Sequence, residues 1–244
     1  QTVLPIENVR SIDEMSFRLI GKEREPETAK GLAKKIKLAI CEQVSPYMTC
    51  SIGIAPNEFL AKLGTDLQKP DGLVVIEASE LPEAIHGLPV KTFCGINRKM
   101  AARLGASGIF VSNDMLAASK EKLRQAFGSV VGERWWYELR GYELDQRATH
   151  RRSLGHSHVL PPSMRTEEGC RSVMLRLIQK ATARLRGEQL WATEIHVWVS
   201  AREQDWKTWA RVHPLQDTVS VVEEFQRMWE KRDFKGTPAG TGVT

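Results

Sequence analysis

Apolar and polar positions in the first third of the chain follow two different periods. Met15, Phe17 and Leu19 alternate with polar neighbours, which is the period of a half-buried strand. Apolar residues within 29–44 and 56–68 recur every three to four positions and predict two amphipathic helices. Further strands are expected at 9–12, 49–54 and 73–76. These elements predict a mixed α/β layer that ends near residue 78.

The rest of the chain divides at a basic stretch, 146–152, which has no apolar periodicity and is expected to be a linker. Before it, 81–144 has a helical pattern with short segments and frequent glycines. After it, the patterns follow in the order β-α-β-β-α, and a final strand begins at the C-terminus. This is a split β-α-β layout, in which both helices cover one face of the sheet and leave the other face free.

Composition restricts the class of protein. Of the 244 residues, 41% are hydrophobic and 27% are charged, which is ordinary for a globular protein. No apolar run reaches the roughly 18–20 residues of a membrane span, and 1–10 lacks the apolar core of a signal peptide. The four cysteines form no C-x-x-C pair. Their scatter argues against a zinc site or a disulfide framework and suits a reducing cytosol.

The net charge of +5 is a mild basic bias with an uneven location. The stretch 151–216 holds eleven Lys or Arg and six Asp or Glu. Such a stretch suits contact with nucleic acid, although an ordinary solvated surface has the same composition. The chain opens without Met, and its end at 240–244 has the pattern of a starting strand. We therefore expect a fragment of a longer protein.

Two adjacent carboxylates, Asp13 and Glu14, lie where two strand-like segments meet. Neighbouring side chains of a regular strand point to opposite faces, so both reach one site only at a strand end or a turn. Such oxygen donors suit Mg²⁺, which keeps several waters and takes substrate phosphates as further ligands. In phosphoryl transfer, two such ions activate the attacking hydroxyl and stabilise the leaving pyrophosphate. The alternative is an acidic pair in a solvated turn, which these two residues alone favour.

A longer string supplies the context. Residues 50–72 read C-S-I-G-I-A-P-N-E-F-L-A-K-L-G-T-D-L-Q-K-P-D-G, and S-I-D-E stands upstream at 11–14. This combination resembles the palm of the Y-family DNA polymerases, the translesion enzymes of the DinB/UmuC or ImpB/MucB/SamB type. The similarity extends over essentially the whole chain. It implies an α+β fold with a partial palm at 1–78, a helical thumb with a helix-hairpin-helix at 79–146, and a split β-α-β little finger that binds DNA at 151–244.

The resemblance also implies roles for single residues. Asp13 and Glu14 match the acidic pair that holds metal for catalysis. Lys69 matches the lysine that contacts the triphosphate of the incoming nucleotide. Lys62, Asp66 and Lys69 are four and three residues apart, so they share one helical face on which Asp66 can fix Lys69. A plain surface ion pair between Lys62 and Asp66 is the alternative.

The segment 88–101 resembles the thumb's helix-hairpin-helix, whose hairpin presents backbone N–H groups to a DNA phosphate. Gly95 is the first hairpin glycine, and Asn97 stands where the family has the second. Because Asn tolerates a positive φ better than most residues, we expect the turn to be kept. Arg98 and Lys99 add positive charge beside it. A helix-turn-helix packing corner is the alternative.

In the little finger, the free sheet face is expected to contact phosphates of the template–primer duplex. Contacts of this kind give salt-dependent binding without sequence preference. The candidates for DNA binding on the strand side are Arg151, Arg152, His156, His158, Arg202, Lys207 and Arg211. The tryptophans are expected to lie mostly in the core, as Trp229 does on its apolar stripe. Trp198 falls on the polar face of its strand, and no tryptophan is assigned to base stacking.

The chain departs from the family pattern at several points. The first metal-binding aspartate and the nucleotide-binding fingers are expected before Gln1 and are absent from this sequence, so the chain alone is expected to hold an incomplete metal site and to be inactive. Glu58 stands where the family commonly has Lys, which removes a positive charge near the site. Met15 replaces a small residue. Residues 160–165 are similar to the catalytically lapsed accessory branch of the family.

Together these features predict a bacterial DNA-repair enzyme of the cytoplasm, associated with the nucleoid. It would add a dNMP to a primer 3′-hydroxyl on damaged template DNA with two Mg²⁺ ions. Template–primer DNA and a dNTP are the expected ligands, and a sliding clamp or other mutagenesis proteins are expected partners. The alternative is a non-catalytic, DNA-binding accessory subunit of a mutagenic polymerase complex, which needs no metal.

Overall fold

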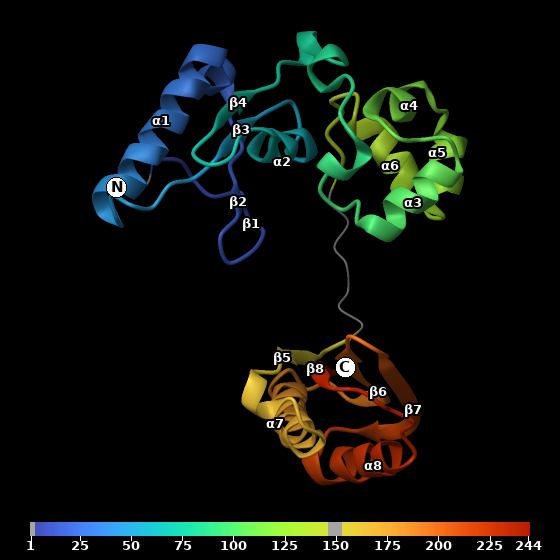
Figure 1. Cartoon of the computed structure of the whole chain (residues 1–244). Coiled ribbons are helices and arrows are strands. Elements are labelled where there is room, and N and C mark those ends of the chain that lie inside the picture. Colours follow the sequence, from blue (N-terminus) through green and yellow to red (C-terminus); the bar gives the residue numbers. More distant parts are fainter. Residues whose placement is uncertain (1–2, 146–152) are drawn as a thin grey trace. The chain divides into compact units, whose positions relative to one another are not determined.

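The chain divides into two compact units, 1–147 and 148–244 (Figure 1). The computed structural model describes residues 3–145 and 153–244. Each unit packs around its own hydrophobic core and is described by itself. The predicted linker at 146–152 lies outside the described residues. Within the described part of the chain, no helix combines the length and the apolar character that crossing a membrane requires.

Unit 1 begins with a short hairpin and a long helix. Strands β1 (Asn8–Val9) and β2 (Met15–Ser16) pair antiparallel. Helix α1 (Pro26–Gln43) has its proline at the first helical position, where the missing N–H costs no hydrogen bond. The helix predicted over 29–44 is confirmed, whereas the alternation of 15–19 yields only two paired residues.

A β-α-β unit follows in the chain. Strands β3 (Ile52–Ile54) and β4 (Leu73–Val75) pair in parallel, and α2 (Glu58–Leu67) is the crossover that a parallel pair requires. This pair and the β1–β2 hairpin are separate two-stranded sheets, so the predicted single layer is not formed. A Cβ at Gly53 would lie 1.9 Å from the carbonyl oxygen of Ala61. The glycine of the S-I-G-I string therefore lets α2 pack directly on β3.

The remainder of unit 1 is helical, as predicted for 81–144. The α-helices are α3 (Arg98–Ala106), α4 (Ser112–Ala117), α5 (Lys120–Phe127) and α6 (Val131–Glu138). The 3₁₀ turns of unit 1 are η1 (Gly21–Arg24), η2 (Ala78–Glu80), η3 (Glu83–Ile85) and η4 (Val90–Thr92).

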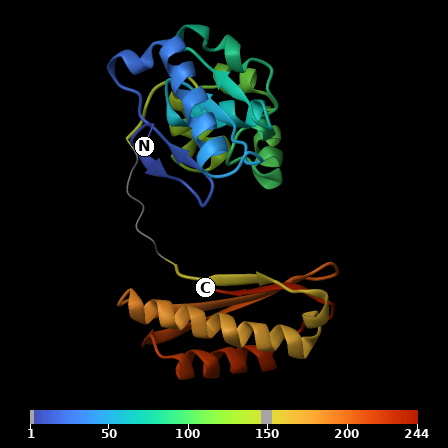
Figure 2. The same cartoon turned by 90° about the vertical axis from the view of Figure 1, so that its left-hand side faces the viewer.

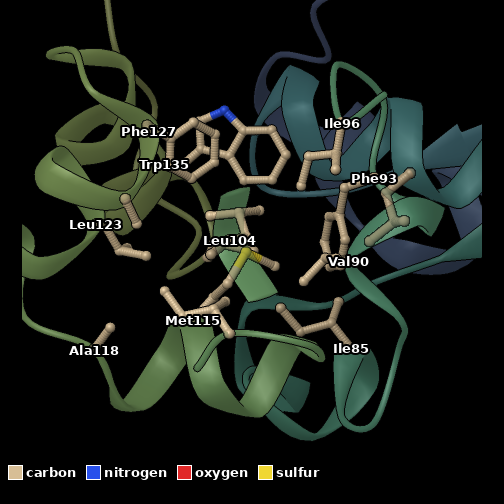
Figure 3. Close-up of a cluster of buried hydrophobic side chains, with 14 of the residues drawn as sticks. Ile85, Val90, Phe93, Ile96, Leu104, Met115, Ala118, Leu123, Phe127 and Trp135 are labelled. Carbon is tan, nitrogen blue, oxygen red and sulfur yellow. The ribbon is translucent and has the colours of Figure 1, made fainter. Parts of the chain in front are cut away.

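One hydrophobic core joins α2 to these helices (Figure 3). Trp135 of α6 meets Phe59 of α2 edge to face, with ring centroids 4.7 Å apart and planes at 67°. Leu60 and Leu63 of α2 are buried in the same core as Leu104 of α3. The predicted boundary at residue 78 therefore does not separate two packed units. The division of 1–146 into palm and thumb stays a prediction.

Unit 2 is a four-stranded antiparallel sheet with two helices on one side (Figure 2). Its elements are β5 (His156–Val159), η5 (Pro162–Met164), α7 (Glu167–Gly187), β6 (Ala192–Ala201), β7 (Trp206–Leu215), α8 (Thr218–Glu230) and β8 (Pro238–Val243). The strand order is β5-β8-β6-β7, so the last strand pairs with the first two. The predicted β-α-β-β-α-β order and the shared side of the helices are confirmed.

The alternation in β6 decides which side chains reach the free face of this sheet. Ile195, Val197 and Val199 are buried and pack with α7 and α8 in the core of unit 2. Since successive side chains of a strand point to opposite faces, the residues between them lie on the side away from the helices.

Candidate functional site

The two carboxylates predicted to hold metal lie in the loop between β1 and β2. The backbone N–H groups of Arg10 and Ser11 both donate to the carbonyl oxygen of Glu14, at 2.8 and 3.2 Å, and close the loop. The Ser11 hydroxyl donates to the Asp13 carboxylate at 2.7 Å. Asp13 and Glu14 are both exposed. Their place in a turn meets the requirement for two neighbouring carboxylates to reach one site.

A chain of ion pairs joins this loop to α2. The Glu14 carboxylate lies 2.7 Å from the Lys62 ammonium. Lys62 is also 3.2 Å from Asp66, whose carboxylate lies 2.7 Å from the ammonium of Lys69. Burial lowers the pKa of Lys62, but hydrogen bonds to Glu14 and Asp66 outweigh this and raise the pKa above its usual value. Lys62 is therefore a charged link between the loop and the helix.

Glu58 stands where the family commonly has a lysine, and its negative charge is paired with Arg10 of the same loop. Arg10 donates two hydrogen bonds to the Glu58 carboxylate, in the bidentate geometry that guanidinium and carboxylate groups favour. Glu58 is the first residue of α2, one helical turn before Lys62. Two ion pairs, Arg10–Glu58 and Glu14–Lys62, thus fasten the carboxylate-bearing loop to one face of α2.

The oxygen donors of this loop fit a hard divalent cation in part. Among residues 3–145 and 153–244, no group of three or more His, Cys, Asp or Glu side chains is arranged to hold a metal ion. Asp13 and Glu14 offer two carboxylates. Mg²⁺ is commonly held by one or two carboxylates together with waters and substrate phosphates. For Glu14 to serve in this way, its carboxylate has to leave Lys62.

The predicted DNA-binding hairpin is a tight turn that leads into α3. Gly95 has a φ of +97°, a conformation that favours glycine. Asn97 has a φ of −79°, so the positive φ considered for this position does not occur. Its side-chain oxygen instead accepts from the N–H of Met100 at 2.9 Å and caps α3. The N–H groups of Arg98 and Lys99 belong to the same first turn, where intrahelical acceptors are lacking.

The free sheet face of unit 2 carries part of the predicted cationic set. Directly opposite residues of an antiparallel pair share a face. Lys207 lies opposite Trp198, and Arg211 lies opposite Glu194, so both cations are on the side away from the helices. Arg211 pairs with Glu194 at 3.1 Å. Arg202 lies just after β6, outside the strand ladder.

The prediction that His156 and His158 lie on the free face is wrong. They pair with Val243 and Thr241 of β8, which are buried in the core under the helices. Both histidines therefore point to the helix side of β5. Ser157, between the two histidines, is also polar, so the sequence pattern did not reveal which side of this edge strand faces the helices.

Comparison with known proteins accounts for both units. A family model described as impB/mucB/samB family matches residues 3–66. The model of the C-terminal domain of the same family matches residues 151–243. The chain belongs to the impB/mucB/samB family, the Y-family polymerases.

Relatives in this family are named DNA polymerase IV. DNA polymerase IV 1 of Bacillus subtilis is 27% identical over 226 residues, which are 89% of this chain and 52% of that protein. DNA polymerase IV of Legionella pneumophila (strain Corby) is 27% identical over 239 residues, 96% of this chain and 66% of that protein. A solved structure, a chimera of the Y-family DNA polymerases Dbh and Dpo4, matches with a TM-score of 0.71 and 26% identity. It covers 98% of this chain and 69% of that chain. The chain thus spans between about half and two thirds of the length of these curated relatives.

The predicted site residues of this impB/mucB/samB family member are brought together only in part. Glu14 and Lys69 lie at the two ends of one chain of ion pairs. The role of Arg10 was missed, because no spacing rule signals a contact between residues so far apart in the sequence. The remaining candidates for DNA binding, Arg151 and Arg152, lie outside the described residues.

Proposed function

We propose that this chain is part of a translesion DNA polymerase, which adds a dNMP to a primer 3′-hydroxyl opposite damaged template bases. The observation that carries the proposal is the contact between the S-I-D-E loop and α2. It forms a line of alternating charge through Glu14, Lys62, Asp66 and Lys69. The proposal is supported by the fact that these ion pairs join a carboxylate suited to metal, Glu14, to an ammonium suited to phosphate, Lys69. Membership of the impB/mucB/samB family supports the same reaction.

In this proposal, Asp13 and Glu14 are the residues that hold Mg²⁺. The bound metal would supply activation of the attacking hydroxyl and charge neutralisation at the leaving pyrophosphate. Lys69 provides a point charge for the triphosphate, and Asp66, 2.7 Å from its ammonium, orients it. Lys62 holds the Glu14 carboxylate against α2 until that carboxylate is needed as a ligand.

We propose that residues of both units bind DNA. The first turn of α3 offers the N–H groups of Arg98 and Lys99 to a backbone phosphate. In unit 2, Lys207 and Arg211 would meet phosphates of the template–primer duplex from the free sheet face. Phosphate contacts carry no sequence information, which suits an enzyme that acts on any template.

The cellular location and the protein partners are proposed on family membership alone. The similar DNA polymerases IV are bacterial proteins, which supports action in the cytoplasm at the nucleoid. A sliding clamp and other mutagenesis proteins are proposed partners on the same ground.

Primer extension on a lesion-bearing template by the full-length protein tests the function. Asp13→Ala and Glu14→Ala are expected to abolish extension and to leave binding of the template–primer duplex unchanged. Glu42→Ala, which removes an exposed carboxylate from α1, is the matched control and is expected to extend normally. Full extension by Asp13→Ala would remove the pair from the active site. A wild-type protein that binds the duplex but never extends it would favour the accessory-subunit alternative.

A further inference from the structure

Lys37 of α1 is a cation that unit 1 surrounds with oxygen acceptors. Helix α1 packs beside β4 (Figure 1). The side chain of Lys37 is only 19% exposed, whereas lysine side chains normally keep their charged end in water. Its ammonium donates to the carbonyl oxygens of Cys50 and Asp71, at 2.6 and 2.8 Å, and to the Asp71 carboxylate at 2.5 Å. All three donor hydrogens of the ammonium are therefore used.

Two of these acceptors belong to Asp71 in the tight turn 68–72, the lysine turn, which follows α2 and contains Lys69. A Cβ at Gly72 would lie 1.9 Å from the carbonyl oxygen of Gln68, so the turn closes only with glycine at this position. Asp71 has a φ of +55°. A residue with a Cβ keeps such a conformation only where its surroundings hold it. The hydrogen bonds from Lys37 to Asp71 supply this hold.

Ser51 holds the lysine turn from the side of β3. Its hydroxyl donates to the carbonyl oxygen of Gln68 at 3.2 Å and accepts from the N–H of Gly72 at 3.2 Å. The carbonyl oxygen of Gly72 in turn accepts from the N–H of Ile52 at 3.0 Å. The two ends of the lysine turn are thus joined to each other and to β3, while Lys37 joins the turn to α1.

Lys69 is carried by this fastened turn, and its ammonium lies at the surface. Its side chain is 57% exposed, and its ammonium is 2.7 Å from the Asp66 carboxylate. Lys37 and Ser51 bind the residues on either side of Lys69. Because all hydrogens of the Lys37 ammonium are already donated within the protein, Lys37 has none left for a phosphate. An effect of Lys37 on a nucleotide therefore has to pass through the turn.

We propose that Lys37 is a positioning residue for Lys69, because it fixes the backbone of the lysine turn from which the Lys69 ammonium reaches the triphosphate of the incoming nucleotide. A lysine ammonium is a point charge on a flexible stem. A fixed base for that stem leaves less conformational freedom to be lost when the ligand binds. The inference rests on the proposed function, which gives Lys69 its role at the triphosphate. It adds α1, which carries none of the predicted site residues, to the nucleotide-binding machinery.

Single-nucleotide incorporation by the full-length protein, measured over a series of dNTP concentrations, tests this inference. It gives the apparent Kd of the dNTP and the maximal rate separately. Lys37→Met is the test variant, because methionine keeps an unbranched apolar stem and lacks the ammonium. Lys37→Arg keeps the positive charge and several donors. Lys35→Met removes an exposed lysine from the same helix and is the matched control.

Lys37→Met is expected to raise the apparent Kd of the dNTP by about tenfold, within the roughly 100-fold that a small misplacement of a binding group can cost. Lys37→Arg is expected to recover most of the affinity. Lys35→Met is expected to stay within about twofold of wild type, because the charge that it removes is exposed and screened. A folding defect lowers the amount of active protein but not its affinity, so the apparent Kd separates positioning from stability.

A double-mutant cycle with Lys69→Ala identifies the route of the effect. If Lys37 acts through Lys69, Lys37→Met changes the apparent Kd by less than about twofold once residue 69 is alanine. Ser51→Ala releases the same turn from β3 and is expected to raise the Kd as well. It is the second test variant, which serves if Lys37→Met does not fold.

Two results would overturn the inference and leave the proposed function standing. One is a wild-type Kd for Lys37→Met together with a raised Kd for Lys69→Ala. The other is an equal effect of Lys37→Met with and without Lys69, which would show that Lys37 acts by another route. If Lys69→Ala itself keeps the wild-type Kd, the role of Lys69 in the proposed function fails, and the inference fails with it.

Discussion

Replacement of Asn57 by alanine tests how α2 is held in unit 1. Asn57 is only 6% exposed and stands at the N-cap of α2. Its side-chain oxygen accepts from the N–H of Leu60 at 2.8 Å. Its amide nitrogen donates to the carbonyl oxygens of Glu138 and Tyr142, at 2.8 and 3.0 Å. One side chain thus starts the helix beside the candidate site and ties it to the end of α6.

The expected loss of stability follows from these three bonds. Removing a side-chain N-cap costs about 1 kcal/mol. The carbonyl of Tyr142 loses the Asn57 donor at a cost of about 1 kcal/mol, whereas the carbonyl of Glu138 still accepts from the N–H of Gly141 at 3.1 Å. Asn57→Ala is therefore expected to lower the free energy of unfolding of unit 1 by about 2 kcal/mol. Asn97→Ala removes an exposed cap that serves only Met100, so about 1 kcal/mol is expected there.

Urea unfolding, with a separate transition fitted for each compact unit, measures both values. Hydrogen exchange locates the effect, because Asn57→Ala is expected to lower protection in α2 and at 138–142 while unit 2 keeps its protection. If the two alanine variants differ by less than about 0.5 kcal/mol, the bonds to the α6 end contribute nothing. The account of how α2 is held would then be refuted.

Two further predictions concern the packing of α2 in unit 1, and a third concerns α8 of unit 2. Gly53→Ala is expected to destabilise unit 1 by about 2 kcal/mol in thermal unfolding, because the new Cβ meets backbone. Gly31 lies in the interior of α1, and a Cβ added there would have no atom within 4 Å, so Gly31→Ala is expected to stabilise unit 1 by up to about 1 kcal/mol. Equal effects of the two variants would contradict the close packing of β3 on α2. Arg10→Glu is expected to lower the free energy of unfolding by about 0.5–1 kcal/mol, because the side chains of the Arg10–Glu58 pair are 36% and 32% exposed. The double variant with Arg10→Glu and Glu58→Arg is expected to recover most of this loss. A double-mutant cycle without recovery would show that the pair adds no stability. Asp217 caps α8, and the hydrogen bond from the backbone N–H of Ser220 lowers the pKa of its carboxyl group. The stability that this cap gives to unit 2 is therefore fully present above the unfolded carboxyl pKa of about 3.9. It is lost as the pH falls through the lowered pKa of the folded state. Asp217→Asn keeps the cap and is expected to flatten the acid limb of unit 2 stability, measured by circular dichroism; an unchanged limb would exclude Asp217 as its source.

The spacing of hydrophobic residues was enough to predict helices and strands that bury one face along their whole length. Helix α7 spans 21 residues with a continuous apolar stripe, and β6 alternates strictly between Ile195 and Val199, so each period has one structural solution. The S-I-G-I string was equally informative for a physical reason. Only glycine at position 53 permits the approach of α2 that brings Lys62 under the S-I-D-E loop.

The sequence was not enough where two roles suit the same residue or where contacts span the chain. Asn97 suits both a positive φ and a helix cap, and only the backbone geometry distinguishes them. The polar run of β5 fits either face, so the pairing with β8 decides where His156 and His158 point. The link between Glu14 and Lys62 joins distant segments and needs the folded β-α-β unit.

Single-turnover incorporation of one dNTP by the full-length protein tests the central claim most directly. Wild type and Asp13→Asn are compared on the same template–primer, with duplex affinity measured in parallel. We predict that Asp13→Asn, which keeps the shape of the side chain but removes its charge, slows incorporation by at least about 100-fold while duplex affinity is unchanged. An incorporation rate within about twofold of wild type would contradict the assignment of Asp13 and Glu14 as the metal-holding pair.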